Sequence, residues 1–111
     1  MTAYRVDFDT IPWESPIEGM RHKVFIQESR KLRLVEYSKK MEPHWCDKGH
    51  YGFVLEGEFE IAFDSETHLY GPGDGIFIPD GKEHRHMGKV LSNVVTVLFV
   101  EDVPPQEVVE P

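Results

Sequence analysis

The sequence predicts an all-β domain built as an antiparallel sandwich or barrel. Short runs with strand character alternate along the chain with turn signals such as 71–75 and 79–83. No stretch of ten or more residues repeats its apolar positions every 3.6 residues, as an amphipathic helix would. The chain has 111 residues, which is the size of one domain.

Alternating or apolar runs predict the individual strands. In chain order these are 4–8, 22–27, 31–37, 50–57, 58–64, 75–79 and 93–100. The clearest period of two lies in 58–64, where Phe59, Ile61 and Phe63 are expected to face inward. Residues 93–100 are apolar on both faces, which indicates a central strand covered on both sides. Phe53 and Phe77 are also expected in the core.

The inward face of the strand at 31–37 stays open at this point. A shift of one residue exchanges the two faces of a strand. One choice places Glu36 in the cavity, where burial would raise the pKa of its carboxyl group; the other places Tyr37 there. The basic residues Arg30, Lys31 and Arg33 are expected on the solvated side of this strand.

Composition excludes several classes of protein. Hydrophobic residues make up 40% and charged residues 29% of the chain, as in an ordinary soluble domain. The net charge of −8 argues against nucleic acid as a partner. No apolar run approaches the ~18 residues of a membrane helix, and the N-terminus does not resemble a secretory signal. A single cysteine excludes an internal disulfide, and together these features favour the cytoplasm.

The stretch HWCDKGH, residues 44–50, is the first candidate site. His44 and Cys46 lie two residues apart, so on an extended strand they point to the same side. A tight turn at 47–49 would bring His50 to the same point. Imidazole nitrogen and thiolate sulfur both bind transition metals, so three ligands can converge here.

Two stretches of the chain resemble the two motifs of the cupin family. The first motif reads G-x5-H-x-H-x(3,4)-E-x6-G, and the second reads G-x5-P-x-G-x2-H-x3-N. In the first, His44 matches, Cys46 stands at the second histidine and His50 at the glutamate, and Gly57 follows after six residues. Four residues match the second motif: Gly73, Pro79, Gly81 and His84. Ser38 and Gly88 replace the first glycine and the final asparagine.

The resemblance implies a double-stranded β-helix, or jelly-roll barrel, in a single domain. It covers 22–100, with an N-terminal strand and proline-rich connection at 1–21. The segment 101–111 is then an acidic tail, which its three prolines exclude from a central strand. Because cupins are commonly dimers and sheet edges need cover, we expect a homodimer.

The resemblance also implies a metal site. Its four ligands in this chain would be His44, Cys46, His50 and His84. With a thiolate and three imidazoles in place of three imidazoles and a carboxylate, the site is softer than the family pattern. It favours a divalent transition metal, zinc first, with iron or nickel as alternatives.

Other interpretations of these residues remain open. Cys46 could be a small buried apolar residue, with His50 a histidine at the mouth of the barrel. A nucleophilic thiol would need a base and an oxyanion site, for which proximity to His44 and His50 is the sole support. His86 is expected on the surface, with a role in the cavity as the alternative.

Three functions fit these features. The first is a small metal-dependent enzyme, an oxygenase or isomerase, acting on an organic molecule in the barrel cavity. The second is a module that binds a small molecule or senses oxidants through Cys46 without turnover. The third is a closed structural metal site with four protein ligands.

Overall fold

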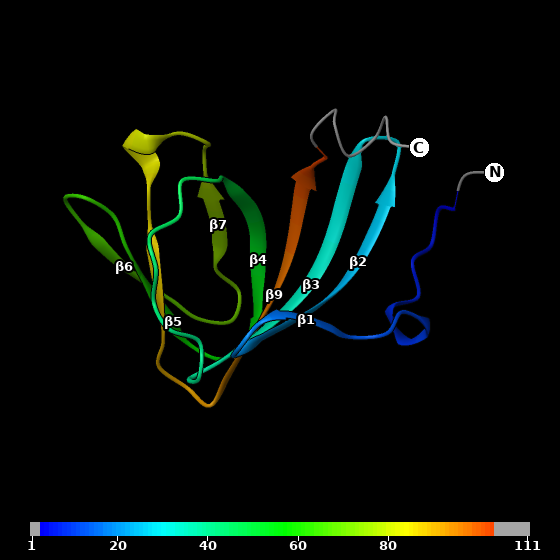
Figure 1. Ribbon diagram of the computed structural model, residues 1–111, viewed down its shortest axis with the longest axis horizontal. Helices are drawn as coiled ribbons and strands as arrows, with labels where there is room; N and C mark the ends of the chain where they lie inside the picture. Colours follow the sequence, from blue (N-terminus) through cyan, green and yellow to red (C-terminus); the bar gives the residue numbers. More distant parts are fainter. Residues whose placement is uncertain (1–2, 104–111) are drawn as a thin grey trace.

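The computed structural model describes residues 3–103, which form two antiparallel sheets (Figure 1). The six-stranded sheet has the order β1-β2-β3-β9-β4-β7, and the three-stranded sheet has the order β6-β5-β8. The strands are β1 (Glu14–Ile17), β2 (Met20–Gln27), β3 (Arg30–Ser38), β4 (His50–Glu56), β5 (Phe59–Ala62), β6 (Thr67–Tyr70), β7 (Gly75–Ile78), β8 (Met87–Val90) and β9 (Val94–Asp102). Two 3-10 turns, η1 (Phe8–Thr10) and η2 (Lys82–His84), complete the elements. The all-β prediction is confirmed, and the two sheets face each other as in a jelly roll without closing into a continuous barrel.

The hydrophobic core lies between the two sheets. Its fully or nearly fully buried side chains come from both sheets and are Val35, Val54, Phe59, Ile61, Ile76, Ile78, Val95, Val97 and Phe99. The inward orientation predicted for Phe59 and Ile61 is confirmed. β9 is central, between β3 and β4, but Val100 on its other face is 45% exposed. Cover on both faces was therefore a wrong expectation for the described part of the chain.

The structure decides the orientation of β3. Tyr37 faces the interior, whereas the Glu36 carboxylate points outward and pairs with the Arg21 guanidinium at 2.7 Å. Because Arg33 lies two and four positions from Val35 and Tyr37, it shares their inward face. Its side chain is 12% exposed, which corrects the expectation that it lies on the solvated side.

The two ends of the described chain differ from the prediction. Residues 4–8 form no strand, and β1 lies at 14–17, inside the segment expected to be a connection. At the other end β9 continues to Asp102, so Glu101 belongs to a central strand rather than a tail. The first proline of that segment is Pro104, so residues 101–103 keep the backbone N–H groups that hydrogen bonds between strands need. The rest of the expected tail, 104–111, lies outside the described residues.

The outer face of the six-stranded sheet carries exposed apolar side chains. Phe53 is 47% and Phe77 is 78% exposed, so their assignment to the core was wrong. Successive residues of a strand face opposite sides of the sheet, and Val54 and Ile76 occupy the inward positions next to Phe53 and Phe77. Tyr51 packs edge-on against Phe77, with ring centroids 4.7 Å apart.

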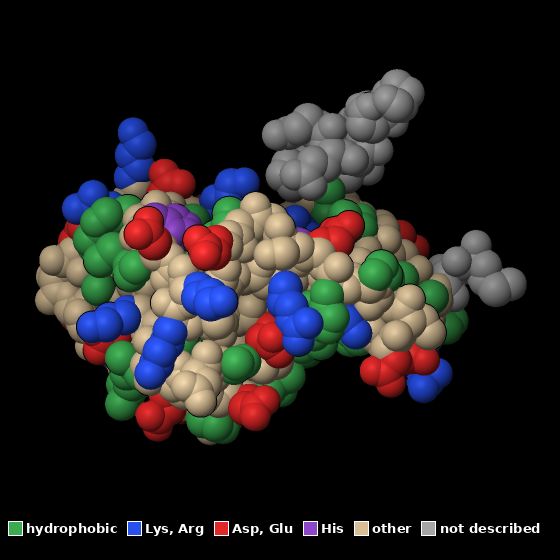
Figure 2. Space-filling view, turned by 60° about the horizontal axis from the view of Figure 1, so that its bottom comes forward, with side chains coloured by type: hydrophobic (Ala, Val, Ile, Leu, Met, Phe, Trp, Pro, Cys, Tyr) green, Lys and Arg blue, Asp and Glu red, His purple; other side chains and the backbone are tan. Residues whose placement is uncertain are grey.

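Figure 2 shows a face on which basic and acidic side chains are interspersed rather than gathered by sign. Across residues 3–103, no helix is long and apolar enough to cross a membrane.

The turn at Gly57 provides a test of the fold. Gly57 has φ +85°, and a Cβ added there would lie 2.0 Å from the carbonyl oxygen of Val94. A positive φ alone costs a non-glycine residue ~1–2 kcal/mol. Gly57→Ala should therefore lower the free energy of unfolding by at least ~1 kcal/mol, measured by urea denaturation. Gly71→Ala, whose added Cβ would meet its nearest atom at 3.9 Å, is the matched control. Equal stability of the two variants would contradict this account.

Candidate metal centre

A short antiparallel bridge joins the two motif segments. The N–H of Cys46 donates to the carbonyl oxygen of His86, and the N–H of His86 donates to that of Cys46, both at 2.8 Å. Residues directly opposite each other in such a pair project their side chains to the same side. The bridge therefore brings the Cys46 thiol and the His86 imidazole together, although the two residues are 40 positions apart in the chain.

The turn at 47–49 brings His50 to the same place. The N–H of Gly81 donates to the carbonyl oxygen of Asp47 at 3.0 Å, and the N–H of Gly49 donates to the Asp80 carboxylate. A Cβ at Gly49 would lie 2.4 Å from the carbonyl oxygen of Ile78, so this close approach requires glycine. These contacts hold the turn against the segment that follows β7, and His50 begins β4 beside it.

Cys46, His50 and His86 form a group able to bind a metal ion. One ligand atom from each of the three lies within 4.8 Å of the other two. The Zn–N and Zn–S distances of a tetrahedral site place ligand atoms about 3.5 Å apart, so small side-chain movements would suffice for coordination. Of the four ligands predicted from the sequence, the structure thus brings two into one group and adds a third that the prediction did not include.

His86 is the most informative of the three residues. It is 6% exposed, which corrects its expected place on the surface. Its Nδ1 lies 3.1 Å from the carbonyl oxygen of His84, while its Nε2 is buried without a hydrogen-bond partner among the described residues. Burial, followed by the charge of His50, lowers the pKa of His86 against the hydrogen bond to His84. The imidazole is therefore neutral near pH 7, as a metal ligand must be.

His84 lies apart from this group. It ends η2, and its side chain lines a separate pocket together with Glu66, His68 and Tyr70. Residues 84 and 86 would share a face on a continuous strand. The 3-10 turn at 82–84 interrupts that alternation, so the two imidazoles enter different parts of the molecule.

His44 lies on the wall of the same cavity as Cys46, outside the group of three. Its side chain is exposed, and its Nδ1 is 3.2 Å from the carbonyl oxygen of Glu42. A carbonyl oxygen accepts and does not donate, so Nδ1 carries the proton in the neutral form of the ring, and the lone pair of that form is on Nε2. His44 is thus available as a further ligand.

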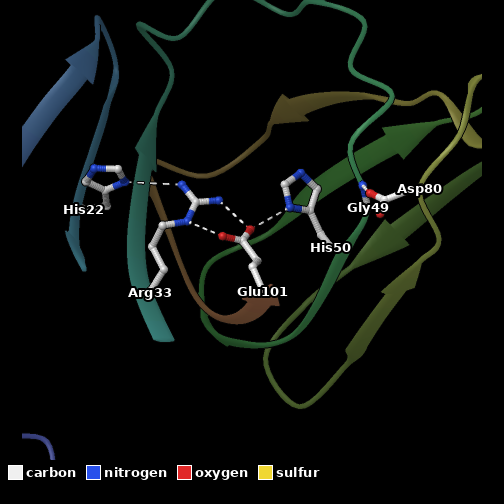
Figure 3. Close-up of polar contacts among 6 residues, drawn as sticks. All are labelled: His22, Arg33, Gly49, His50, Asp80 and Glu101. Carbon is white, nitrogen blue, oxygen red and sulfur yellow. Dashed lines mark hydrogen bonds and ion pairs between the residues drawn. The ribbon is translucent and has the colours of Figure 1, made fainter. Parts of the chain in front are cut away.

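Sequence analysis missed the group that holds His50. The Glu101 carboxylate receives two hydrogen bonds from Arg33, Nε to Oε1 at 3.0 Å and Nη2 to Oε2 at 2.8 Å (Figure 3). His50 Nδ1 donates to the same Oε2 at 3.0 Å. The three residues come from the adjacent strands β3, β9 and β4. Glu101 was missed because 101–111 was expected to be a tail. Its position directly after an apolar strand could have indicated a carboxylate at the end of that strand.

This arrangement fixes the charge state and tautomer of the site. Burial raises the pKa of Glu101, but hydrogen bonds from His50 and Arg33 outweigh it and lower the value to about 2. The ionised carboxylate accepts the Nδ1 proton of His50, which leaves Nε2 as the possible ligand atom. His44, His50 and His86 each have Nδ1 beside an oxygen acceptor, and among residues 3–103 none of their Nε2 atoms has a hydrogen-bond partner, which is the usual pattern around a metal.

Cys46, His50 and His86 all line a cavity of about 200 Å³. The remaining wall is largely apolar and includes Ile17, Met20, Met41, Phe59, Ile61 and Ile76. Tyr37 also lines it, with its ring 6.2 Å from that of Phe59. Burial raises the pKa of Tyr37 to about 12, so its hydroxyl group stays protonated near neutral pH.

Comparison with known sequences places this architecture in a family. The sequence profile of the cupin domain matches residues 32–101. The chain belongs to the cupin family. Comparison with curated proteins gives no significant match to this cupin.

Several solved structures share the fold of this cupin. An RmlC-like cupin from Shewanella frigidimarina has a TM-score of 0.74 at 16% identity, with 97% of each chain covered. KdgF from Halomonas sp. has a TM-score of 0.69 at 20% identity, covering 91% of this chain and 95% of KdgF. HppE with iron(II) has a TM-score of 0.70 at 15% identity, covering 88% of this chain and 59% of HppE. At these identities the likeness concerns the fold.

The low pKa of Glu101 predicts how the free energy of unfolding changes at acidic pH. Its carboxyl group titrates at about 2 in the folded protein, below its ordinary value of 4.5. The stabilisation from the ionised group is therefore complete above the unfolded value and is lost as the pH falls through the folded one. Near pH 7 the metal-free protein should have a higher free energy of unfolding than Glu101→Gln. This difference should shrink as the pH falls from about 4.5 to about 2. Urea titrations between about pH 7 and about pH 2.5 measure it. A difference independent of pH would contradict the assignment.

Proposed function

We propose that this cupin binds a divalent transition metal through Cys46, His50 and His86 and acts on a small organic molecule in the adjacent cavity. The buried Nε2 of His86, unpartnered beside the other two ligands, is the observation that carries the proposal. An unsatisfied buried nitrogen costs free energy unless something binds it. A metal ion would satisfy it and use the lone pair left free by the Nδ1 contact.

The donor set suits some metals better than others. One thiolate and two imidazoles form a soft set that favours zinc, iron or nickel over manganese, and zinc is our first choice. Iron stays in consideration because HppE, which shares the fold, was solved with iron(II). Three protein ligands would leave one position open toward the cavity, as in catalytic sites. The metal would supply Lewis-acid chemistry, such as that of an isomerase, or oxygenase chemistry if it is iron.

His44 distinguishes two versions of the site. As a fourth protein ligand it would close a tetrahedral set, which is the structural alternative. As a neighbour on the cavity wall it would contact the organic molecule instead. Its exposure and its place outside the group of three favour the second version.

A redox-sensing function is the second candidate. Cys46 is also a lining residue of a surface pocket that includes Asp47, Lys48, Lys82 and Arg85, and an oxidant could approach the residue through it. Oxidation of Cys46 would then weaken metal binding without any turnover of a substrate.

Replacement of single histidine and cysteine residues tests the proposed metal site. After reconstitution under reducing conditions, the protein should contain close to one transition-metal ion per chain by elemental analysis. His86→Ala and Cys46→Ala should each lose most of this metal, because each removes a ligand of the proposed site. His84→Ala is the matched control, two positions away, and should keep it. Loss of metal in His84→Ala with retention in His86→Ala would restore the ligand set predicted from the motif.

We also propose that the protein is a cytoplasmic homodimer. The outer face of the six-stranded sheet supports a second copy as the partner, because apolar side chains on β9, β4 and β7 lie in register there. The matched residues are Val100, Tyr51 and Phe77. Such a face is costly to leave in water, and isologous pairing of two copies would cover both at once.

Light scattering tests the dimer. The protein should have twice the mass of one chain in solution, and Phe77→Glu should shift it toward the monomer by burying a charge in the interface. Leu69→Glu on β6 is the control, because Leu69 is 64% exposed but belongs to the other sheet. A monomeric parent protein would refute the proposal.

A further inference from the structure

Arg33 uses only part of its hydrogen-bonding capacity within the protein. Its Nε–H and one N–H of Nη2 donate to the two oxygens of Glu101, and its Nη1 lies 3.3 Å from His22 Nδ1 (Figure 3). Because a guanidinium only donates, His22 Nδ1 is the acceptor in this third contact. One N–H on each terminal nitrogen of Arg33 therefore has no protein partner among residues 3–103.

The two unused N–H groups lie along one edge of the guanidinium. The edge formed by Nε and Nη2 faces Glu101, and Figure 3 shows His22 on the opposite side of the guanidinium from Glu101. In a planar guanidinium this arrangement leaves the edge between Nη1 and Nη2, from which two N–H groups point in parallel. Such an edge matches the two oxygens of a carboxylate.

Arg33 is part of the cavity wall. Its side chain is 12% exposed, and it lines the cavity together with His50 and Phe99. The carbon at the centre of the guanidinium is 5.4 Å from the centre of the Phe99 ring, which in turn is 4.8 Å from the ring of His50. Figure 3 shows the far end of the guanidinium and the second ring nitrogen of His50 on the same side of the Glu101 carboxylate. An acid group on the unused edge would therefore lie beside the candidate metal site.

The rest of the cavity limits what can be attached to that acid group. A dry cavity of ~150 Å³ is enough for one benzene ring, and this cavity has about 200 Å³. An apolar body of about one ring therefore fits, whereas a second charged group would be buried without a partner. The apolar side chains that would contact the body include Met20, Met41, Phe59, Ile61, Ile76 and Ile78.

We infer that Arg33 binds the carboxylate of a small organic acid through the edge between Nη1 and Nη2, with the apolar body of the acid in the cavity. Arg33 is then shared between Glu101 on one edge and the ligand on another. The inference rests on the part of the proposed function that places a small organic molecule in the cavity, and it adds the chemical class of that molecule. It does not require the metal, because both N–H groups belong to the protein.

Calorimetric titration with benzoate and benzamide tests the inference. The two probes have the same ring, but the amide replaces one acceptor oxygen with a nitrogen that donates. Benzoate should bind at least about tenfold more tightly than benzamide, both to the zinc-loaded and to the metal-free protein. Arg33→Lys should weaken benzoate binding about tenfold, because lysine keeps the charge but has no parallel pair of donors. Arg21→Lys, which alters a pair with Glu36 on the outside of the same sheet, is the matched control and should leave the affinity unchanged.

Further variants keep the test valid if Arg33→Lys does not fold. The double variant Arg33→Gln with Glu101→Gln removes both charges of the pair, so neither remains buried alone. It should bind benzoate about tenfold more weakly than Glu101→Gln, which differs from it only at Arg33. Gly88→Val adds a side chain to the cavity wall opposite Ile61 in the β5–β8 pair and should also weaken benzoate binding, because it occupies space that the ring needs.

The outcomes separate this inference from the proposed metal site. Preference for benzoate that persists without zinc, is lost in Arg33→Lys and is kept in Arg21→Lys supports the inference. Absence of benzoate binding, binding in the zinc-loaded protein alone, or unchanged affinity in Arg33→Lys and in the double variant would overturn it and leave the metal site standing. If the parent protein takes up no zinc, the metal site fails and the metal-free titration decides the inference by the same criteria.

Discussion

The buried ion pair between Arg33 and Glu101 is the interaction on which the site depends. The two side chains are 12% and 13% exposed, and they link β3 to its neighbour β9. Neither charge could remain there alone, because an unpaired buried charge costs several kcal/mol. Oε2 of the same carboxylate, which accepts from Arg33, also accepts from His50 of β4. One interaction thus satisfies the charges between the strands and orients a residue of the candidate metal site.

The second constraint is local and belongs to the backbone. Cys46 and His86 are paired by two hydrogen bonds outside any regular strand, and the glycine at 49 allows the adjacent turn to approach the chain after β7. Side chains in a paired bridge have little freedom of direction. The metal-binding group is therefore preorganised by main-chain contacts on one side and by a carboxylate on the other. Such support from outside the ligand set is what gives a metal site its geometry.

The same cavity is lined by this preorganised group and by apolar side chains. Inward positions of both sheets supply the wall, because alternate residues of β5 and β7 belong to the core. The same alternation leaves Phe53 and Phe77 on the outside of the six-stranded sheet. One periodicity thus accounts for the apolar interior that can hold a small molecule and for the apolar exterior that suits a second copy.

Part of the candidate site could be predicted from the sequence, because several of its residues lie close together in the chain. Period two and the frequent turns indicated a β fold, and the spacing of His44, Cys46 and His50 reflects local geometry over a few residues, which sequence analysis can follow. The resemblance to the cupin motifs located the second segment to within two residues. Gly57, the last glycine of the first motif, has a positive φ, as the tight connection between two strands requires.

Tertiary structure decided what local pattern could not. Whether His84 or His86 joins Cys46 and His50 depends on the 3-10 turn that ends at His84. No periodicity in residues 79–88 predicts this turn. The role of Glu101 depends on which strands become neighbours, because its partners Arg33 and His50 are 68 and 51 positions away. By itself the sequence determined the fold class and the residue types of the candidate metal site, which follow from residue identity and short-range spacing. The place of His86 in the group and the Glu101 carboxylate that holds His50 followed from long-range strand pairing and burial.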